Sequence, residues 1–188
     1  MAELLKVLEK ENRNKSEESF TKVLHMEKEY VEDLIHKTMP KLEFSCVKKV
    51  NNNFLEGMYL LTKQEYLARN GFCEEMNLLH VTSQSNVEPI VKDNLNWRKV
   101  VRQVYGPGTY FSNDARYANS LCSPLCGEKR AFLVCKVLVA VSSHFAQSNV
   151  PPSPIDTLIL DSGRIVVKYA DNEFLPLFVA YYDYKSQV

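Results

Sequence analysis

The chain has 188 residues, with 23 basic and 23 acidic side chains and therefore no formal net charge at pH 7. Hydrophobic residues make up 45% of the sequence and charged residues 24%, which excludes a disordered, collagen-like or low-complexity chain. The charge balance argues against nucleic-acid binding driven by overall electrostatics, while a local basic patch stays open. At roughly 100–200 residues per domain, the length predicts a single domain over 1–188.

The sequence offers no targeting or membrane signal. No run approaches the ~18 apolar residues of a membrane span, and the charged N-terminus lacks the apolar region of a signal peptide. We therefore expect a protein of the cytoplasm or nucleus that binds no membrane. The five cysteines are expected to be reduced thiols. Cys122 and Cys126 form the only close pair, and zinc would need two further ligands at metal spacing, so no metal site is predicted.

The first third of the chain, 1–70, has the spacing of amphipathic helices. Leu4, Leu5 and Leu8 share one face of a charged opening segment, and apolar residues from 20 to 35 recur at i, i+3 and i+4. We assign 1–29 to an N-terminal helical extension and 30–188 to the core.

Pro40 ends the second helix, because proline donates no backbone N–H and biases the preceding residue away from helix. Segment 41–53 alternates apolar and polar residues and predicts a short strand, while 54–67 returns to helical spacing.

From residue 77 the sequence is typical of short strands separated by turns. Gly106-Pro107-Gly108 and the prolines of 151–154 are turn signals. The strands are predicted at 78–82, 109–111, 131–142, 164–169 and 177–184. Helices followed by a mostly antiparallel sheet define an α+β fold.

Several segments in a fixed order carry a resemblance to a known family. They are Leu78–Ser83, Asn94–Arg98, Tyr105–Ser112, Ala131–Val139 and Pro176–Tyr184. In this order the chain resembles the catalytic domain of the poly(ADP-ribose) polymerase (PARP) family, which has the diphtheria-toxin-like ADP-ribosyltransferase fold. The Asn-Trp-Arg segment is most similar to the short mono-ADP-ribosyltransferases with CCCH zinc fingers and WWE domains, a group that includes the zinc-finger antiviral protein.

This resemblance implies a sheet that splits around a cleft for NAD+. In that family a His holds the ribose, and the following Gly holds the nicotinamide amide through its backbone. Two Tyr cover the faces of the nicotinamide ring, a Ser bonds its amide, and a Glu late in the chain orients the ribose and permits polymer elongation.

Two of these positions keep the family's residue, since the His falls on His80 and the first Tyr on Tyr110. The other four depart from it: the Gly, Ser, second Tyr and Glu fall on Val81, Ala118, Leu121 and Leu177. His80 is therefore either a ribose ligand or a core histidine bonded to a backbone carbonyl. Because position 121 has no aromatic side chain, Tyr110 could cover only one face of the nicotinamide ring. The sequence also stops at Val188, about where the family's last strand would begin, which indicates either a piece of a longer protein or a replacement strand from elsewhere in the chain, such as 41–46.

Each departure has a physical cost for NAD+. Val81 adds a branched side chain where glycine allows close approach. Ala118 leaves a hydrogen bond unmade, at ~1–3 kcal/mol, and Leu121 gives up stacking of ~0.5–1.5 kcal/mol. Together these predict NAD+ affinity lower by ~30- to several-thousand-fold. Leu177 excludes chain elongation, because no carboxylate polarises an acceptor hydroxyl.

Two functions follow. We favour a degenerate domain that binds NAD+ weakly or not at all and acts as a scaffold or interaction module for protein partners. The alternative is an active mono-ADP-ribosyltransferase in which His80 and Tyr110 position the ribose and ADP-ribose passes to a protein or nucleic-acid acceptor. A third hypothesis is a remodelled, more apolar cleft that takes another ligand or is filled by its own side chains.

RNA is a further candidate partner. Trp97, Arg98, Lys99 and Arg102 form a basic-aromatic cluster that fits either a phosphate or RNA site or a loop packed by one tryptophan. The resemblance to antiviral relatives also implies a role near RNA regulation, although the sequence contains no RNA-binding motif.

Overall fold

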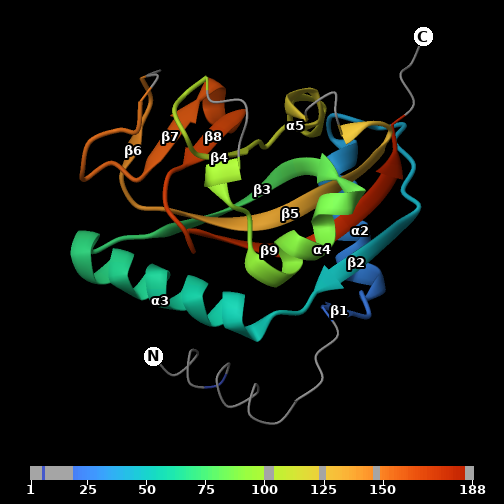
Figure 1. Ribbon diagram of the computed structural model, residues 1–188, viewed down its shortest axis with the longest axis horizontal. Helices are drawn as coiled ribbons and strands as arrows, with labels where there is room; N and C mark the ends of the chain where they lie inside the picture. The colour runs from blue at the N-terminus through green and yellow to red at the C-terminus, as the bar shows by residue number, and fades with distance from the viewer. Residues whose placement is uncertain (1–5, 7–18, 100–103, 123–125, 146–148, 185–188) are drawn as a thin grey trace.

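The computed structural model describes residues 6, 19–99, 104–122, 126–145 and 149–184. Two β-sheets and four helices make up most of this part of the chain (Figure 1). The predicted opening helix with Leu4, Leu5 and Leu8 lies outside the described residues. No helix among the described residues is long and apolar enough to cross a membrane.

The larger sheet has five antiparallel strands in the order β1-β2-β9-β5-β3. These strands are β1 (Phe20–Thr21), β2 (Cys46–Val50), β9 (Phe174–Asp183), β5 (Lys129–Val139) and β3 (Glu74–Ser83). The order leaves β3 at one edge. β9 lies between β2 and β5, so both of its edges are paired. β2 begins at Cys46, the last residue of segment 41–46, which was considered as a replacement strand.

The smaller sheet has the order β4-β8-β7-β6, with only β6 and β7 parallel. Its strands are β4 (Thr109–Phe111), β8 (Ile165–Lys168), β7 (Thr157–Leu160) and β6 (Ser142–Ser143). The two sheets meet at one bridge, where Leu79 N–H donates to Ser112 O at 2.8 Å and Ser112 N–H donates to Leu79 O at 2.9 Å. Helices combined with two mostly antiparallel sheets confirm the α+β prediction.

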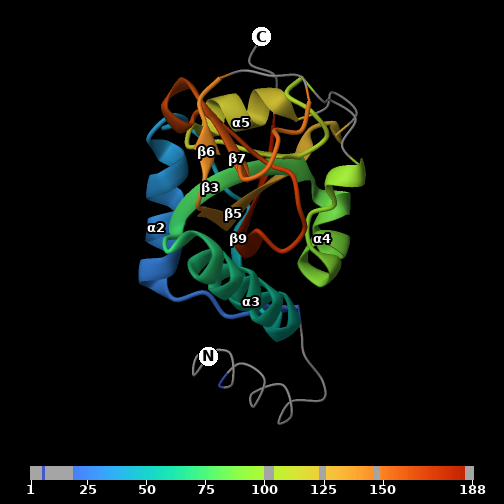
Figure 2. The same ribbon diagram turned by 90° about the vertical axis from the view of Figure 1, so that its left-hand side faces the viewer.

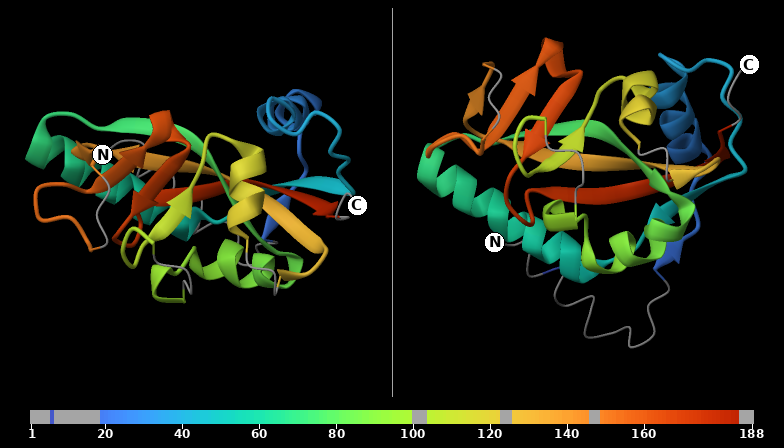
Figure 3. Two further views of the ribbon diagram at one scale, coloured as in Figure 1. Left: turned by 90° about the horizontal axis from the view of Figure 1, so that it is seen from above. Right: turned by 45° about the horizontal axis from the view of Figure 1, so that its top comes forward.

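Four helices pack on these sheets: α2 (His25–His36), α3 (Asn53–Asn70), α4 (Val87–Asp93) and α5 (Ala115–Leu121). Three 3₁₀ turns add to them: η1 (Gln84–Asn86), η2 (Trp97–Lys99) and η4 (Asp161–Gly163). Figure 2 shows α2 and α4 on opposite sides of the long strands. The right-hand view of Figure 3 shows the smaller sheet and α5 above those strands.

Local sequence explains where α3 begins and ends. The Asn52 side chain accepts a hydrogen bond from Leu55 N at 3.0 Å, which satisfies one of the free N–H groups of the first turn. Gly71 follows the last turn with φ of 71°, a left-handed conformation that glycine adopts without cost.

The helical prediction over 20–35 was wrong at its start. Phe20 and Thr21 form β1 and pair with Val50 and Lys49, and the helix begins only at His25. The Glu27 carboxylate accepts the Leu24 N–H at 2.9 Å, which fixes this later start. A two-residue strand has no periodicity of its own, so only its pairing with β2 reveals it.

The two faces of the larger sheet bury different sets of side chains. On one face, α2 and α5 cover the β3 residues Leu79 and Val81. On the other face, α4 covers Leu78 together with Phe111 of β4. Because neighbouring residues of a strand point to opposite faces, the edge strand β3 presents one row of side chains to α4 and the other to α5.

Candidate functional site

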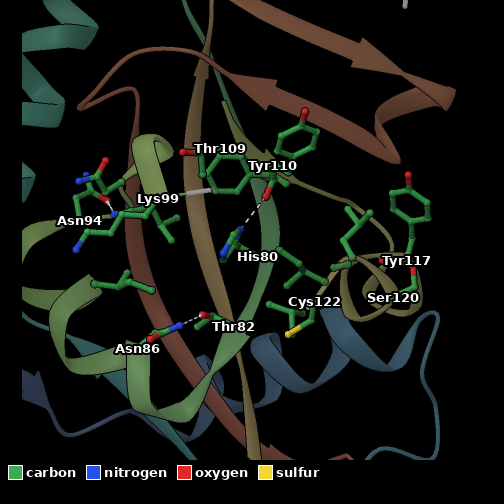
Figure 4. A pocket seen from close by; sticks show the side chains of 18 of the residues that line it. His80, Thr82, Asn86, Asn94, Lys99, Thr109, Tyr110, Tyr117, Ser120 and Cys122 are labelled. Atoms are coloured by element: carbon green, nitrogen blue, oxygen red, sulfur yellow. Dashed lines mark hydrogen bonds between the residues drawn. The ribbon is translucent and has the colours of Figure 1, made fainter. Parts of the chain in front are cut away.

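A cavity of about 830 Å³ lies along the edge strand β3, between α4 and α5 and beside β4 (Figure 4). Five of the six residues predicted for the site line it: His80, Val81, Tyr110, Ala118 and Leu121. The structure thus brings together side chains from β3, β4 and α5, as the resemblance implied. Cavities of this size, apolar with a few polar groups, are typical of small-molecule sites.

His80 is held in one tautomer by its neighbour on β4. Its Nδ1 lies 2.8 Å from the backbone O of Tyr110, and because a carbonyl oxygen only accepts, Nδ1 is the protonated nitrogen. Burial lowers the pKa of His80, against the opposing effect of this hydrogen bond. The ring is therefore neutral at pH 7, and its Nε2 offers a lone pair. His80 therefore bonds a backbone carbonyl, as the core-histidine hypothesis expected, and it also lines the pocket.

Tyr110 is fixed through its hydroxyl. The hydroxyl donates to Gly106 O at 2.8 Å and accepts from Tyr105 N at 2.9 Å, so the ring lines the pocket in a fixed orientation. Gly108 allows the preceding turn to approach β8, because a Cβ there would lie 2.6 Å from Lys168 O. Tyr110 is thus a ring held in place by the turn that was predicted from Gly106-Pro107-Gly108.

Val81 contributes backbone groups as well as its side chain. Leu79 uses its N–H and C=O for Ser112, on the side away from β5. Since alternate residues of an antiparallel strand direct these groups to the same side, Val81 also directs its N–H and C=O away from β5. On that side they have no hydrogen bond to another described residue. Among the described residues, the Val81 N–H and C=O are therefore a donor and an acceptor without a backbone partner at the edge of the pocket.

The α5 wall of the pocket is apolar at positions 118 and 121, beside Tyr117 and Ser120 of the same helix. Asp114 caps this helix through its Oδ1, which accepts from Tyr117 N at 3.0 Å, and this places Ala118 and Leu121 toward the cavity. Cys122 follows them, and burial raises the pKa of its thiol to about 12, so the sulfur remains protonated. Ser120 also lines the pocket, but its hydroxyl donates to Tyr117 O at 2.7 Å and does not replace the hydroxyl absent at position 118.

The assignment of the family's Glu position to Leu177 stays a prediction. Leu177 lies on β9, where it packs in part against the α2 and α3 clusters, and it does not line the pocket. A β-bulge between β5 and β9 also shifts the pairing register beside it.

Sequence reasoning missed Thr109, which also lines the pocket. Thr109 is 2% exposed, and its Oγ1 has no hydrogen-bond partner among the described residues. The only available signal was a polar residue in a strand that is otherwise aromatic. Burial and lack of a partner are tertiary properties that this pattern does not show.

The basic-aromatic cluster divides between two roles. The Arg98 guanidinium stacks over the Trp97 ring at 4.3 Å and donates to both carboxylate oxygens of Asp171 at 3.0 Å. Lys99 lines the pocket instead, and Arg102 lies outside the described residues. Lys99 is the single basic residue and Asp93 the single acidic residue among the described lining residues. No group of three or more His, Cys, Asp or Glu side chains in the described part could hold a metal.

Comparison with known proteins gives a consistent result. The family model described as the poly(ADP-ribose) polymerase catalytic domain matches residues 21–154, which include His80, Val81, Tyr110, Ala118 and Leu121 but not Leu177.

Similar curated proteins include the mono-ADP-ribosyltransferase PARP11 of Mus musculus, 32% identical over 96 residues, which are 49% of this chain and 29% of the relative. PARP12 of Homo sapiens is 32% identical over 91 residues, covering 46% of this chain and 13% of the relative. PARP14 of Homo sapiens is 30% identical over 159 residues, covering 80% of this chain and 9% of the relative. The chain thus spans less than a third of the length of these relatives.

Proposed function

Because the chain belongs to the poly(ADP-ribose) polymerase catalytic-domain family, we propose that it is a degenerate mono-ADP-ribosyltransferase domain. It retains the fold and the pocket, binds NAD+ weakly, and acts as a scaffold or interaction module for protein partners. The observation that carries the proposal is the pair of apolar residues on the α5 wall, where Ala118 and Leu121 line the pocket at the positions that the resemblance gives to a hydrogen-bonding Ser and a stacking Tyr.

The chemistry of NAD+ makes this wall decisive. Transfer of ADP-ribose requires the nicotinamide to be held while its bond to the ribose breaks. The α5 wall offers neither a hydroxyl at 118 nor a ring at 121 for that group. The pyridinium ring is also a cation, and the one acidic lining residue that the structure describes, Asp93, belongs to α4 on the other side. Moving the charged pyridinium from water to an apolar wall without a counter-charge costs free energy, and this lowers the affinity for NAD+.

The test is titration of the full chain with NAD+ to millimolar concentration, by calorimetry and by thermal shift, together with a transfer assay using labelled NAD+. We expect no saturation below about 1 mM and no transfer, because the lost contacts amount to ~2–5 kcal/mol. The variant Ala118→Ser with Leu121→Tyr should bind NAD+ at least about tenfold more tightly, equivalent to ~1.4 kcal/mol.

The matched control is Leu61→Tyr, which makes the same change at an exposed position of α3 and should leave NAD+ binding unchanged. Tight NAD+ binding by the unmodified chain, or transfer abolished by His80→Ala, would contradict the proposal.

One set of observations favours the second candidate function, an active mono-ADP-ribosyltransferase. His80 and Tyr110 lie together, and the free N–H and C=O of Val81 match the acceptor and donor of a primary amide. In this reaction the nicotinamide leaves with the bonding electron pair, and an acceptor nucleophile attacks the positively charged ribose carbon. The attacking group of the acceptor loses its proton to a base that the acceptor molecule itself supplies. Labelled ADP-ribose on an acceptor would establish this function.

A further inference from the structure

Two of the five cysteines lie together at the end of α5. All five are free thiols in the structure. Cys122 follows the last turn of α5, where its N–H donates to Asn119 O at 3.3 Å, and it is 9% exposed. Cys126 is half-buried and packs against the core cluster that contains Cys122, and the two thiols are hydrogen-bonded to each other. The two sulfur atoms are therefore already in contact in the reduced protein.

One side chain joins the two ends of the segment that carries these cysteines. The Arg130 Nε donates to Gly127 O at 2.8 Å, directly after Cys126. Its Nη1 donates to Asn119 O at 3.2 Å and to Asn119 Oδ1 at 2.9 Å, in the last turn before Cys122. Because both ends are bonded to the same guanidinium, the thiols are held near each other, and a bond between them costs little further chain entropy.

Arg130 is also a buried cation beside the thiols. It is 8% exposed, and in the described part of the chain its guanidinium has no carboxylate partner and stacks over the Tyr184 ring at 4.2 Å. Burial and the hydrogen bond with Cys126 raise the pKa of Cys122 to about 12, while the charge of Arg130 acts in the opposite direction. A cation at this distance favours anionic forms of sulfur. The site thus combines a thiol pair with a counter-charge for an oxidised sulfur.

Exposure gives the two thiols different roles. Cys126 is half-buried, so a small oxidant from solvent can reach its sulfur. Cys122 is buried on the α5 side of the pocket (Figure 4), and its protonated thiol is a poor target for an oxidant. It is nevertheless in contact with Cys126. Cys126 is therefore the thiol that is oxidised first, and Cys122 is the thiol that reacts with the product.

We propose that Cys122 and Cys126 form a reversible disulfide when the chain meets hydrogen peroxide, and that Arg130 positions the pair. The Cys126 sulfur breaks the O–O bond of the peroxide, becomes a sulfenic acid and releases one water. The Cys122 sulfur then forms the S–S bond as the S–O bond breaks, and the hydroxyl leaves with the Cys122 proton as a second water. The two thiols lose two electrons and two protons, and one peroxide is reduced to two waters.

The disulfide would alter one wall of the pocket. Cys122 lines the pocket, whereas Cys126 is not among the described residues that line it. Oxidation therefore replaces a thiol of the wall by a cross-link that fixes the end of α5. This is the helix that carries Ala118 and Leu121, so the redox state would be expressed at the pocket whether or not NAD+ binds there.

The experiment treats the reduced full chain with one to ten equivalents of hydrogen peroxide, removes the excess with catalase, and alkylates the remaining thiols in denaturant. Trypsin cleaves after Arg116 and Lys129, so both cysteines lie in the single peptide 117–129. We expect this peptide to be unalkylated and about 2 Da lighter than its dithiol form, because two hydrogen atoms are lost. Dithiothreitol before alkylation should restore the doubly alkylated peptide.

Single substitutions separate the roles of the two thiols. In Cys122→Ser, the sulfenic acid of Cys126 has no thiol to react with, so dimedone should label it at least fivefold more than in the unmodified chain. In Cys126→Ser, Cys122 should remain a thiol. The matched control is Cys46→Ser, the same change at an exposed cysteine of β2, which should leave disulfide formation unchanged. Arg130→Lys keeps the charge but lacks the forked donors, and should slow disulfide formation at least fivefold.

Full alkylation of peptide 117–129 after ten equivalents of peroxide overturns the inference, and so does a disulfide from either cysteine to another cysteine or to a second chain. Sulfinic acid at Cys126 beside an intact Cys122 thiol also overturns it, because Cys122 then fails to reach the oxidised sulfur. Thermal unfolding of each reduced variant shows whether it is folded. An unchanged rate in a folded Arg130→Lys protein would contradict the positioning role of Arg130.

Discussion

Two polar regions lie close together around one strand pair and differ in how their hydrogen-bonding groups are satisfied. Thr109 of β4 pairs directly with Lys168 of β8. Lys168 is fully buried, and its Nζ lies 2.8 Å from Asp156 Oδ1, 2.7 Å from Thr157 Oγ1 and 3.4 Å from Glu173 Oε1. Thr109 is almost as buried, but its hydroxyl has no partner among the described residues.

The partners of Lys168 are themselves satisfied. Asp156 Oδ2 accepts from Val141 N at 2.6 Å, and Glu173 accepts from the Tyr66 hydroxyl and from Ala170 N. We name Lys168, Asp156, Glu173 and Tyr66 the ionic cluster. It joins α3 to the strands β7, β8 and β9. The difference teaches that this fold satisfies its deeply buried charges with several partners each, while the Thr109 hydroxyl, like Asn70 Nδ2 and Trp97 Nε1, is buried without a partner among the described residues.

The largest expected effect is on the ionic cluster. Lys168→Ala should lower the free energy of unfolding by ~3–5 kcal/mol, because it leaves two buried carboxylates without a counter-charge. Urea denaturation measures this. Lys168→Met combined with Asp156→Asn and Glu173→Gln should recover much of the loss. A loss no larger than that of Arg98→Ala, which breaks an exposed ion pair, would show that the cluster is not stabilising as a unit.

Acid should weaken the same cluster more gradually. Burial alone would raise the pKa of Asp156, but the Lys168 ammonium and the hydrogen bonds from Thr157 and Val141 hold it below its ordinary value. A carboxylate with a depressed folded pKa stabilises the protein above its unfolded pKa, near 4, and loses that contribution as pH falls through the folded value. Unfolding free energies from pH 6 to pH 2 should therefore fall most steeply below pH 4. A variant with Asp156→Asn and Lys168→Met should show a shallower slope.

At the pocket, Tyr110→Phe should lower the free energy of unfolding by ~1–3 kcal/mol, because Gly106 O and Tyr105 N–H lose their shared hydrogen-bond partner. It should also weaken pocket ligands, since the ring is no longer fixed. Tyr169→Phe is the matched control, because its hydroxyl donates to Tyr105 O at 2.8 Å and the residue does not line the pocket. Equal ligand affinity in the two variants would contradict a positioning role for the Tyr110 hydroxyl.

The smallest effect has the opposite sign. Thr109→Val should stabilise the ligand-free protein by about 1 kcal/mol, because it removes a buried hydroxyl that has no partner. Urea denaturation under the same conditions as for Lys168→Ala gives the comparison directly. Destabilisation by this variant would mean that the hydroxyl is satisfied in solution, and the contrast between the two regions would then disappear.

Periodicity predicted the long elements of the fold well. The helix expected at 54–67 is α3, and the strand expected at 109–111 is β4 to the residue. It did not reveal α4 and α5, which have seven residues each and are too short to show a repeat. These are the two helices that flank the pocket, so the walls of the site were harder to predict than the core.

The site residues that could be predicted from the sequence are those that belong to a distinctive sequence motif. His80 and Tyr110 were placed together correctly because both belong to short, distinctive segments. Leu177 was assigned from the segment Pro176–Tyr184, which lies beyond the residues that match the family model, so its role stays a prediction. Thr109 was missed because what distinguishes it is a buried hydroxyl without a hydrogen-bond partner among the described residues. A sequence pattern can indicate that a residue is buried, but it does not show whether its polar atoms have partners.

The single bridge between Leu79 and Ser112 has a consequence for how such a domain can change. Backbone hydrogen bonds at this bridge join the two sheets beside the pocket, and Ser112 Oγ accepts the Asp114 N–H at 3.0 Å where β4 leads into α5. The side chains at 81, 118 and 121 line the pocket and take no part in these bonds. Substitutions at 81, 118 and 121 can therefore change the chemistry that the pocket offers to a ligand while the backbone bonds that join its two sheets stay in place.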